Sequence, residues 1–198
     1  MRLLKKVINA FSNKTNTLVK SSIEKLKNKD YKGARKELDE AILITPAYEA
    51  LHNRGAAHYY LSNFTEAIRD YTMAIELEPE SPQAYLGLGI LYTKLENYQD
   101  AIKCYNDFLK INPKHSIVYS NRGYVKLKIK DFDGAIADFN KAIKLNPRNG
   151  LAYCNRGSAK YYLGKAEEAC IDWLQAKTLG FHEAEELLDK HCFQKPGK

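Results

Sequence analysis

The chain has 198 residues, a net charge of +7 and a hydrophobic fraction of 44%. A chain of this length can bury a sizeable core in one or two domains. It has no apolar run of the roughly 18 residues that a membrane-spanning helix needs, and lysines interrupt its first apolar residues, which argues against a secretory signal.

The positive charge is confined to one end of the chain. Residues 1–29 carry eight basic side chains and one acidic side chain, so the rest of the sequence is neutral. A nucleic-acid interface would spread basic residues along a whole face of the fold. We therefore expect no nucleic-acid partner.

Residues 1–14 form a basic, amphipathic segment that predicts a separate N-terminal helix or extension. Leu4, Ile8 and Phe11 share one helical face with Val7, and basic residues surround them. This segment could contact an anionic membrane surface. Alternatively, it could cap the helices that follow.

From residue 15 the chain is governed by an internal repeat. Residues 64–79, 98–113 and 132–147 align without gaps at a spacing of 34 residues, and residues 31–46 and 166–181 add two further copies. The predicted units are 15–47, 48–81, 82–115, 116–149 and 150–183.

Each unit predicts two helices. With Thr15, Tyr48, Pro82, Ser116 and Gly150 as repeat position 1, the first helix runs over about positions 2 to 14, and its apolar and small residues recur at a helical period. Position 8 is glycine in four units and position 20 is alanine in all five. We expect the missing Cβ at position 8 to let the alanine dock closely. Residues 182–198 predict a capping helix and tail, in which Leu187 and Leu188 cover the last unit.

This pattern resembles the tetratricopeptide repeat: small residues at positions 8 and 20, an aromatic residue at 24 and proline at 32. The resemblance covers residues 15–183. It implies an all-α fold, a right-handed superhelical solenoid of antiparallel helix pairs, that acts as a protein-binding scaffold without enzymatic activity or a cofactor.

The triplet Asn-Arg-Gly recurs in three units, and each of its arginines is followed sixteen residues later by an aspartate. The arginine and the aspartate change together. Leu88 and Cys104 replace both members of the pair in the third unit. We infer an arginine–aspartate pair within each of the three units that carry the triplet, since breaking a buried pair costs about 3–5 kcal/mol. Ligand binding by the arginines is the alternative. The pairs are Arg54 with Asp70, Arg122 with Asp138, and Arg156 with Asp172.

The asparagines of the triplet, Asn53, Asn121 and Asn155, stand at position 6. The family's geometry turns this position toward the concave face, where an amide can bind the backbone of an extended peptide. The alternative is a solvated surface amide. In the third unit Gly87 replaces the asparagine, which predicts an apolar patch with Leu86 and Ile90 for a hydrophobic anchor of the ligand.

Other side chains on the same face complete the predicted peptide site. Tyrosine offers a large, rigid contact area with a polar tip, although single tyrosines could instead pack between repeats. These residues are His52, Tyr59, Tyr60, Leu86, Ile90, Lys94, Tyr124, Lys128, Tyr161 and Tyr162.

Several chemistries are not expected. The lysines and asparagines by which co-chaperone members of the family hold a terminal carboxylate are absent, apart from the middle asparagine. No histidine or cysteine spacing predicts a metal site, and no pair of carboxylates predicts acid–base catalysis. The four cysteines lack disulfide-type or zinc-type spacing, so we expect reduced thiols in a cytoplasmic protein.

The leading hypothesis is a non-enzymatic scaffold that binds an extended segment of a partner protein in its concave groove. The alternatives are an adaptor tethered to the cytoplasmic membrane surface by residues 1–14 and a self-associating solenoid. The sequence identifies neither the partner nor the oligomeric state.

Overall fold

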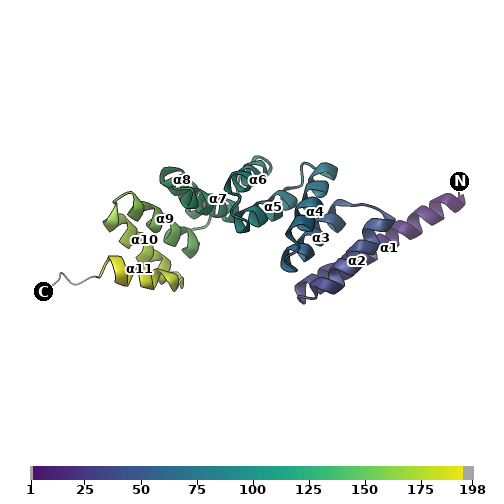
Figure 1. Cartoon of the computed structure of the whole chain (residues 1–198), viewed down its shortest axis with the longest axis horizontal. Helices are drawn as coiled ribbons and strands as arrows, with labels where there is room; N and C mark the ends of the chain where they lie inside the picture. The colour runs from purple at the N-terminus through teal and green to yellow at the C-terminus, as the bar shows by residue number, and fades with distance from the viewer. Residues whose placement is uncertain (1, 194–198) are drawn as a thin grey trace. The chain divides into compact units, whose positions relative to one another are not determined.

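The computed structural model describes residues 2–193, with the side chains of residues 9–193, and its regular elements over this range are all α-helices. The predicted all-α chain of helix pairs is confirmed. The chain forms two compact units, Met1–Lys94 and Leu95–Lys198. Figure 1 shows the helices in chain order.

The first unit holds two complete helix pairs and the first helix of a third. Each helix packs against the next one along the chain. The helices are α1 (Arg2–Lys27), α2 (Tyr31–Ile44), α3 (Tyr48–Tyr60), α4 (Phe64–Leu77) and α5 (Pro82–Lys94).

The second unit continues the pattern and adds the C-terminal helix. Its helices are α6 (Tyr98–Ile111), α7 (Ser116–Lys128), α8 (Phe132–Leu145), α9 (Gly150–Tyr162), α10 (Ala166–Thr178) and α11 (Glu183–His191). Helices α3, α5, α7 and α9 each begin at repeat position 1. In each repeat the first helix is called helix A below, and the second helix is called helix B.

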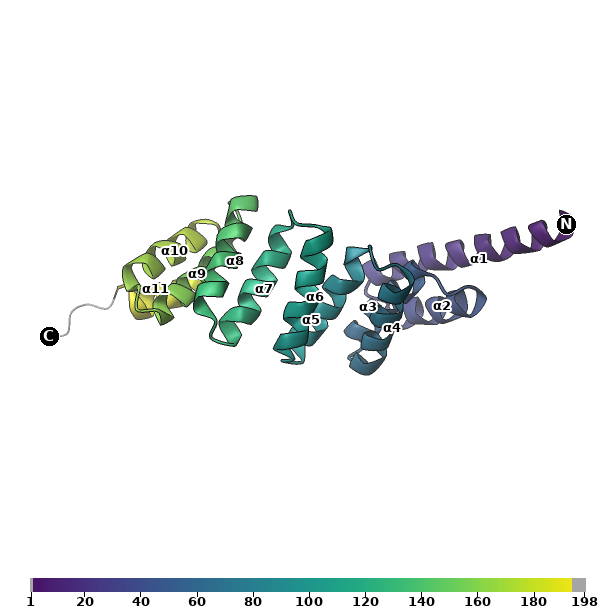
Figure 2. The same ribbon diagram turned by 90° about the horizontal axis from the view of Figure 1, so that it is seen from above.

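The N-terminal segment is not a separate helix. Residues 2–27 form one unbroken helix, because they contain no glycine or proline that would end it. The N-terminal half of α1 runs past the end of α2 (Figure 2), and residues 9–14 are all exposed. Lys14 pairs with Glu40 of α2 at 2.7 Å. Both the capping role and the membrane contact of residues 1–14 stay predictions.

The turn between helix A and helix B has the same backbone conformation in every repeat. Position 15 has a positive φ in all five, from 59° at Glu96 to 77° at Gly164. Only Gly164 reaches this left-handed region without a steric cost. The repeated turn sets the antiparallel direction of each helix B.

The glycine at position 8 accommodates an aromatic ring, which corrects our expectation of the alanine at position 20. A Cβ on Gly123 would lie 2.9 Å from the ring of Phe139, and one on Gly157 would lie 2.7 Å from Trp173. Both rings come from position 24 of helix B. The alanines at position 20 are fully buried, but the ring is what excludes a side chain at position 8.

Helix α11 covers the last repeat. Leu188 is only 2% exposed and packs with Ala184 against Trp173 and Ala176 of α10. Leu187 is partly buried against the same cluster. An apolar end of a repeat array needs such a cover, since each repeat otherwise buries its faces against its neighbours.

The prediction of four reduced cysteines is wrong for two of them. Cys170 and Cys192 form a disulfide that joins α10 to the residue following α11, whereas Cys104 and Cys154 are free and buried. Spacing alone missed the bond because packing of α11 on α10 brings together two residues that lie 22 positions apart. Cysteine usage therefore no longer supports a cytoplasmic location.

Reduction of this disulfide should loosen α11. Closure of a loop of 22 residues stabilises a fold by about 3 kcal/mol. Dithiothreitol should therefore lower the melting temperature of the wild type, measured by circular dichroism. The variant Cys170→Ala/Cys192→Ala should melt like the reduced wild type and should not respond to dithiothreitol. A wild-type melting curve that does not change on reduction would contradict this role.

Candidate peptide-binding surface

Each arginine of the repeated triplet forms a two-pronged ion pair with the aspartate sixteen residues later. Arg122 donates from Nε and Nη2 to the two carboxylate oxygens of Asp138 at 2.8 and 2.6 Å. Arg54 and Arg156 bind their aspartates in the same way. The aspartates Asp70, Asp138 and Asp172 are 0%, 4% and 2% exposed, so these pairs lie in the interior.

A second cation supports the buried carboxylate in two repeats. Lys126 Nζ lies 2.9 Å from Asp138, and Lys160 Nζ lies 2.9 Å from Asp172. His58 takes the corresponding place 3.9 Å from Asp70, and burial lowers the pKa of its imidazole. Hydrogen bonding to Asp138 raises the pKa of the Arg122 guanidinium. The arginines thus remain charged and occupied by their partners.

The remaining arginine nitrogen binds the preceding repeat, which sequence reasoning missed. Nη1 of Arg122 donates to Asn106 Oδ1 at 2.6 Å, and Nη1 of Arg156 donates to Asn140 Oδ1 at 2.6 Å. Arg54 binds Asp39 at 2.9 Å. All three acceptors stand at position 25, so each arginine ties two consecutive repeats together.

A signal for this contact exists in the sequence. Position 25 holds an asparagine or aspartate before every arginine-bearing repeat, but it holds Thr72 before Leu88. In the third repeat Tyr92 and Cys104 replace the supporting cation and the aspartate. The arginine, its aspartate, the supporting cation and the acceptor at position 25 are therefore replaced together. The boundary between the two units falls after Lys94, within this third repeat.

The three asparagines at position 6 are half-buried on α3, α7 and α9. They stand one residue before the arginines, which turns their side chains away from the ion pairs by about 100° around the helix. Among the residues that the structure describes, the side chains of Asn53, Asn121 and Asn155 have no hydrogen-bond partner, and their amides are available to a ligand.

The position of the missing asparagine is filled by a ring. A Cβ on Gly87 would lie 2.6 Å from Tyr71 of the preceding repeat, so no larger residue fits there without moving this tyrosine. Leu86 is half-buried, and Ile90 is 37% exposed. The apolar patch thus lies over the buried ring of Tyr71, which is 4% exposed, and offers Ile90 as its accessible side chain.

In the first unit, aromatic side chains gather near the ends of the A helices. Tyr60 stacks on Tyr31 at a ring distance of 4.5 Å, and its edge meets Tyr59. The amino group of Lys94 lies 5.6 Å from the ring of Tyr59 and 5.8 Å from that of Phe64. Tyr31 and Phe64 both stand at repeat position 17, which is aromatic in the first four repeats.

His52 is turned into the fold. Its ring lies 5.8 Å from Tyr48 and 5.7 Å from Tyr71, and burial lowers its pKa, which keeps the imidazole neutral. Its Nδ1 atom is buried without a hydrogen-bond partner among the described residues. Of the predicted site residues, this one has the strongest packing role.

In the second unit, Tyr161 and Tyr162 differ although they are adjacent. The ring of Tyr161 lies 4.3 Å from His191 and 5.7 Å from Trp173, so it packs toward the capping helix. Tyr162 is 65% exposed and stacks on Phe132 at 5.2 Å. An open pocket of about 600 Å³ lies beside this stacked pair; its lining comprises Tyr124, Leu127, Lys128, Lys130, Phe132, Ser158 and Tyr162.

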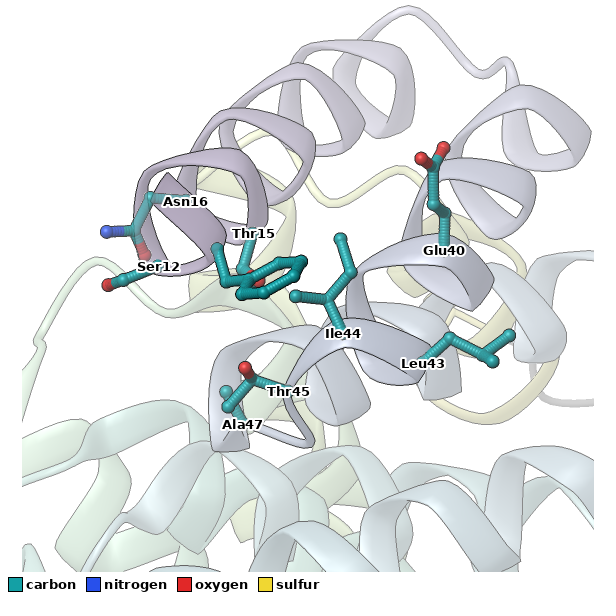
Figure 3. A pocket seen from close by; sticks show the side chains of 9 residues that line it. Ser12, Thr15, Asn16, Glu40, Leu43, Ile44, Thr45 and Ala47 are labelled. Atoms are coloured by element: carbon teal, nitrogen blue, oxygen red, sulfur yellow. The ribbon is translucent and has the colours of Figure 1, made fainter. Parts of the chain in front are cut away.

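A larger hollow of about 950 Å³ lies in the first unit between α1 and the C-terminal end of α2. Figure 3 shows Thr15 of α1 facing Ile44 of α2 across it. Phe11 of α1 also lines the hollow. The Thr15 hydroxyl is buried without a partner among the described residues. None of the predicted peptide-binding residues lines this hollow.

The described part of the chain contains neither a group of histidine, cysteine or acidic residues arranged to hold a metal ion nor a helix apolar and long enough to cross a membrane. The predicted site therefore consists of amides, aromatic rings and lysines. Such groups bind by hydrogen bonding, stacking and charge.

Comparison with known proteins identifies the repeat. The family described as tetratricopeptide repeat matches residues 52–116 and 116–149. The Protein SGT1 homolog of Oryza sativa subsp. japonica is 41% identical over 61 residues, which are 30% of this chain and 17% of that protein. The chain thus matches less than a fifth of the length of this relative.

Solved structures of MamA share the fold. One MamA structure superposes with a TM-score of 0.76 at 22% identity, covering 94% of this chain and 100% of that chain. MamA 41-end from Desulfovibrio magneticus RS-1 gives a TM-score of 0.78 at 18% identity, covering 84% and 95%. At these identities the likeness shows the fold alone.

Removal of one arginine should be far more harmful than replacement of its whole network. Arg122→Ala leaves Asp138 buried with one cation, and we expect a loss of about 3 kcal/mol in the free energy of unfolding, measured with urea. The set Arg122→Leu, Asp138→Cys, Asn106→Thr and Lys126→Tyr copies the third repeat and leaves no buried charge. It should recover most of that loss. An unchanged urea midpoint for Arg122→Ala would refute the structural role.

Proposed function

The chain is a tetratricopeptide-repeat protein, and we propose that this protein-interaction scaffold binds an extended segment of a partner protein through the amides at repeat position 6. The observation that carries the proposal is the recurrence of Asn121 and Asn155 on equivalent turns of α7 and α9. Both are half-buried, and their side chains have no hydrogen-bond partner among the described residues. Asn53 repeats the arrangement on α3 in the first unit.

The chemistry of these side chains suits a peptide backbone. An asparagine amide accepts one hydrogen bond and donates two, so it can bind both the C=O and the N–H groups of an extended chain. Tyrosines, which combine an apolar ring with a polar hydroxyl group, lie on the same helices: Tyr59 and Tyr60 on α3, and Tyr124 on α7. Exposed tyrosines of this kind are enriched where proteins recognise one another.

The arginines are a poor alternative as ligand-binding groups. Arg54, Arg122 and Arg156 already donate three hydrogen bonds each, two of them to a buried aspartate. A ligand anion would have to displace an aspartate. The amides face no such competition.

Peptide selection tests the proposal. Peptides chosen by the wild type from a random 12-residue display library should bind the variant Asn53→Ala/Asn121→Ala/Asn155→Ala at least roughly tenfold more weakly, because each lost hydrogen bond contributes about 0.5–1.5 kcal/mol. Fluorescence polarisation measures the affinities.

A matched control separates binding from general damage. Lys141→Ala/Gln175→Ala changes two exposed side chains on α8 and α10, both of which are B helices, and it should bind the selected peptides as the wild type does. The proposal fails if no peptide is selected, or if the asparagine variant retains full affinity.

A further inference from the structure

We propose that the pocket beside Phe132 and Tyr162 reads the sequence of the bound segment: it takes one aromatic and one acidic side chain, two residues apart on one face of an extended peptide. This inference rests on the proposed function and assigns it a ligand class. The pocket lies wholly within the second unit, between the fourth and fifth repeats.

The aromatic part of the pocket is already assembled. Phe132 and Tyr162 stack at 5.2 Å with 16° between their planes, and the ring of Tyr124 forms a further part of the lining. Tyr162 is 65% exposed and Tyr124 36% exposed. Rings held in this way offer an open face to a third aromatic side chain at little entropic cost.

The charged part consists of two lysines. The amino group of Lys128 lies 5.6 Å from the Tyr124 ring, and Lys130 stands on the left-handed turn that follows α7, with a φ of 64°. Both are exposed, and neither has an ion pair among the described residues. The lining contains no carboxylate, so the two lysines would attract a negatively charged side chain of a ligand.

Two other lysines of the same repeats, Lys126 and Lys160, pair with Asp138 and Asp172. The carboxylate of Asp131, next to Lys130, accepts a hydrogen bond from the N–H of Gly134 at the start of α8. Lys141 and Lys144 of α8 are exposed but do not line the pocket, so Lys128 and Lys130 supply the positive charge of its lining.

The corresponding places in neighbouring repeats lack this combination. Lys94 stands where Lys128 does, but Glu96 takes the place of Lys130. Tyr60 and Ser62, and likewise Tyr162 and Gly164, carry no charge at these two positions. In the first repeat Lys27 and Lys29 stand at these two positions, but Lys27 pairs with Glu24 at 2.7 Å. The acidic preference is thus expected to be strongest at the pocket beside Phe132 and Tyr162.

The pocket continues the row of peptide-binding amides. Tyr124 follows Asn121 by three residues on α7, and Ser158 follows Asn155 by three on α9. Residues three apart are neighbours on one helix face. A segment whose backbone binds the two amides can therefore place side chains in the pocket, and alternate residues of an extended chain point to the same side.

Pools of defined peptides test this pocket. Amidated, fluorescein-labelled decapeptides are randomised except for their fixed central residues, and three pools are compared. The first pool combines Glu-x-Phe with Phe-x-Glu. The second pool has Lys in place of Glu, and the third has Ser in place of Phe. In fluorescence polarisation, the acidic–aromatic pool should bind the wild type roughly 5–10-fold more tightly than the other two pools.

The variant Lys128→Gln/Lys130→Gln should lose the preference for Glu over Lys while it still binds peptides. Lys141→Gln/Lys144→Gln, which removes the same charge from exposed positions of α8, should keep the preference. Equal binding of all pools, or a preference that survives in Lys128→Gln/Lys130→Gln, overturns the pocket alone. Failure of every pool to bind the wild type overturns the proposed function and the pocket together.

Discussion

The structure depends on an arginine at repeat position 7 that donates hydrogen bonds to three oxygen atoms of two side chains. Arg122 binds both oxygens of a buried aspartate within its own repeat and an amide oxygen of the repeat before it. A buried carboxylate needs such partners, since burial without them costs several kcal/mol. The contact fixes the rotation of helix A against both neighbours, and it thereby fixes the direction in which Asn121, one residue earlier, faces. Stability and binding are thus set by adjacent residues with separate tasks.

The third repeat shows that the network is replaced as a unit. Leu88 and Cys104 are buried, each 7% exposed, where other repeats bury an arginine and an aspartate. Thr72 and Tyr92 complete the change. Partial replacement would leave one charge without its partner, whereas complete replacement leaves none. The loss of the asparagine at position 87 has a different cause, because the ring of Tyr71 fills the space that its side chain would take.

The sequence alone predicted the helices and the arginine–aspartate partners, because both leave a periodic trace: apolar residues at helical spacing, and two positions that change together within one chain. It did not predict contacts that depend on how helices pack. The ring of Phe139 against Gly123, the stacking of Tyr162 on Phe132 and the bond between Cys170 and Cys192 all join elements whose approach no spacing specifies. The contact at position 25 could have been predicted, because the residue there changes together with the arginine. It was missed because the two residues belong to successive repeats.

The most direct test of the account is the coupling between Arg156 and Asn140, which belong to successive repeats and lie 2.6 Å apart. A double-mutant cycle with Arg156→Leu and Asn140→Ala, followed by urea unfolding, isolates this contact from the loss of the ion pair with Asp172. We predict a coupling energy of about 1 kcal/mol, as for a hydrogen bond to a charged group whose partner is exposed. Additive effects of the two substitutions, with a coupling below roughly 0.3 kcal/mol, would contradict the claim that the arginines join the repeats.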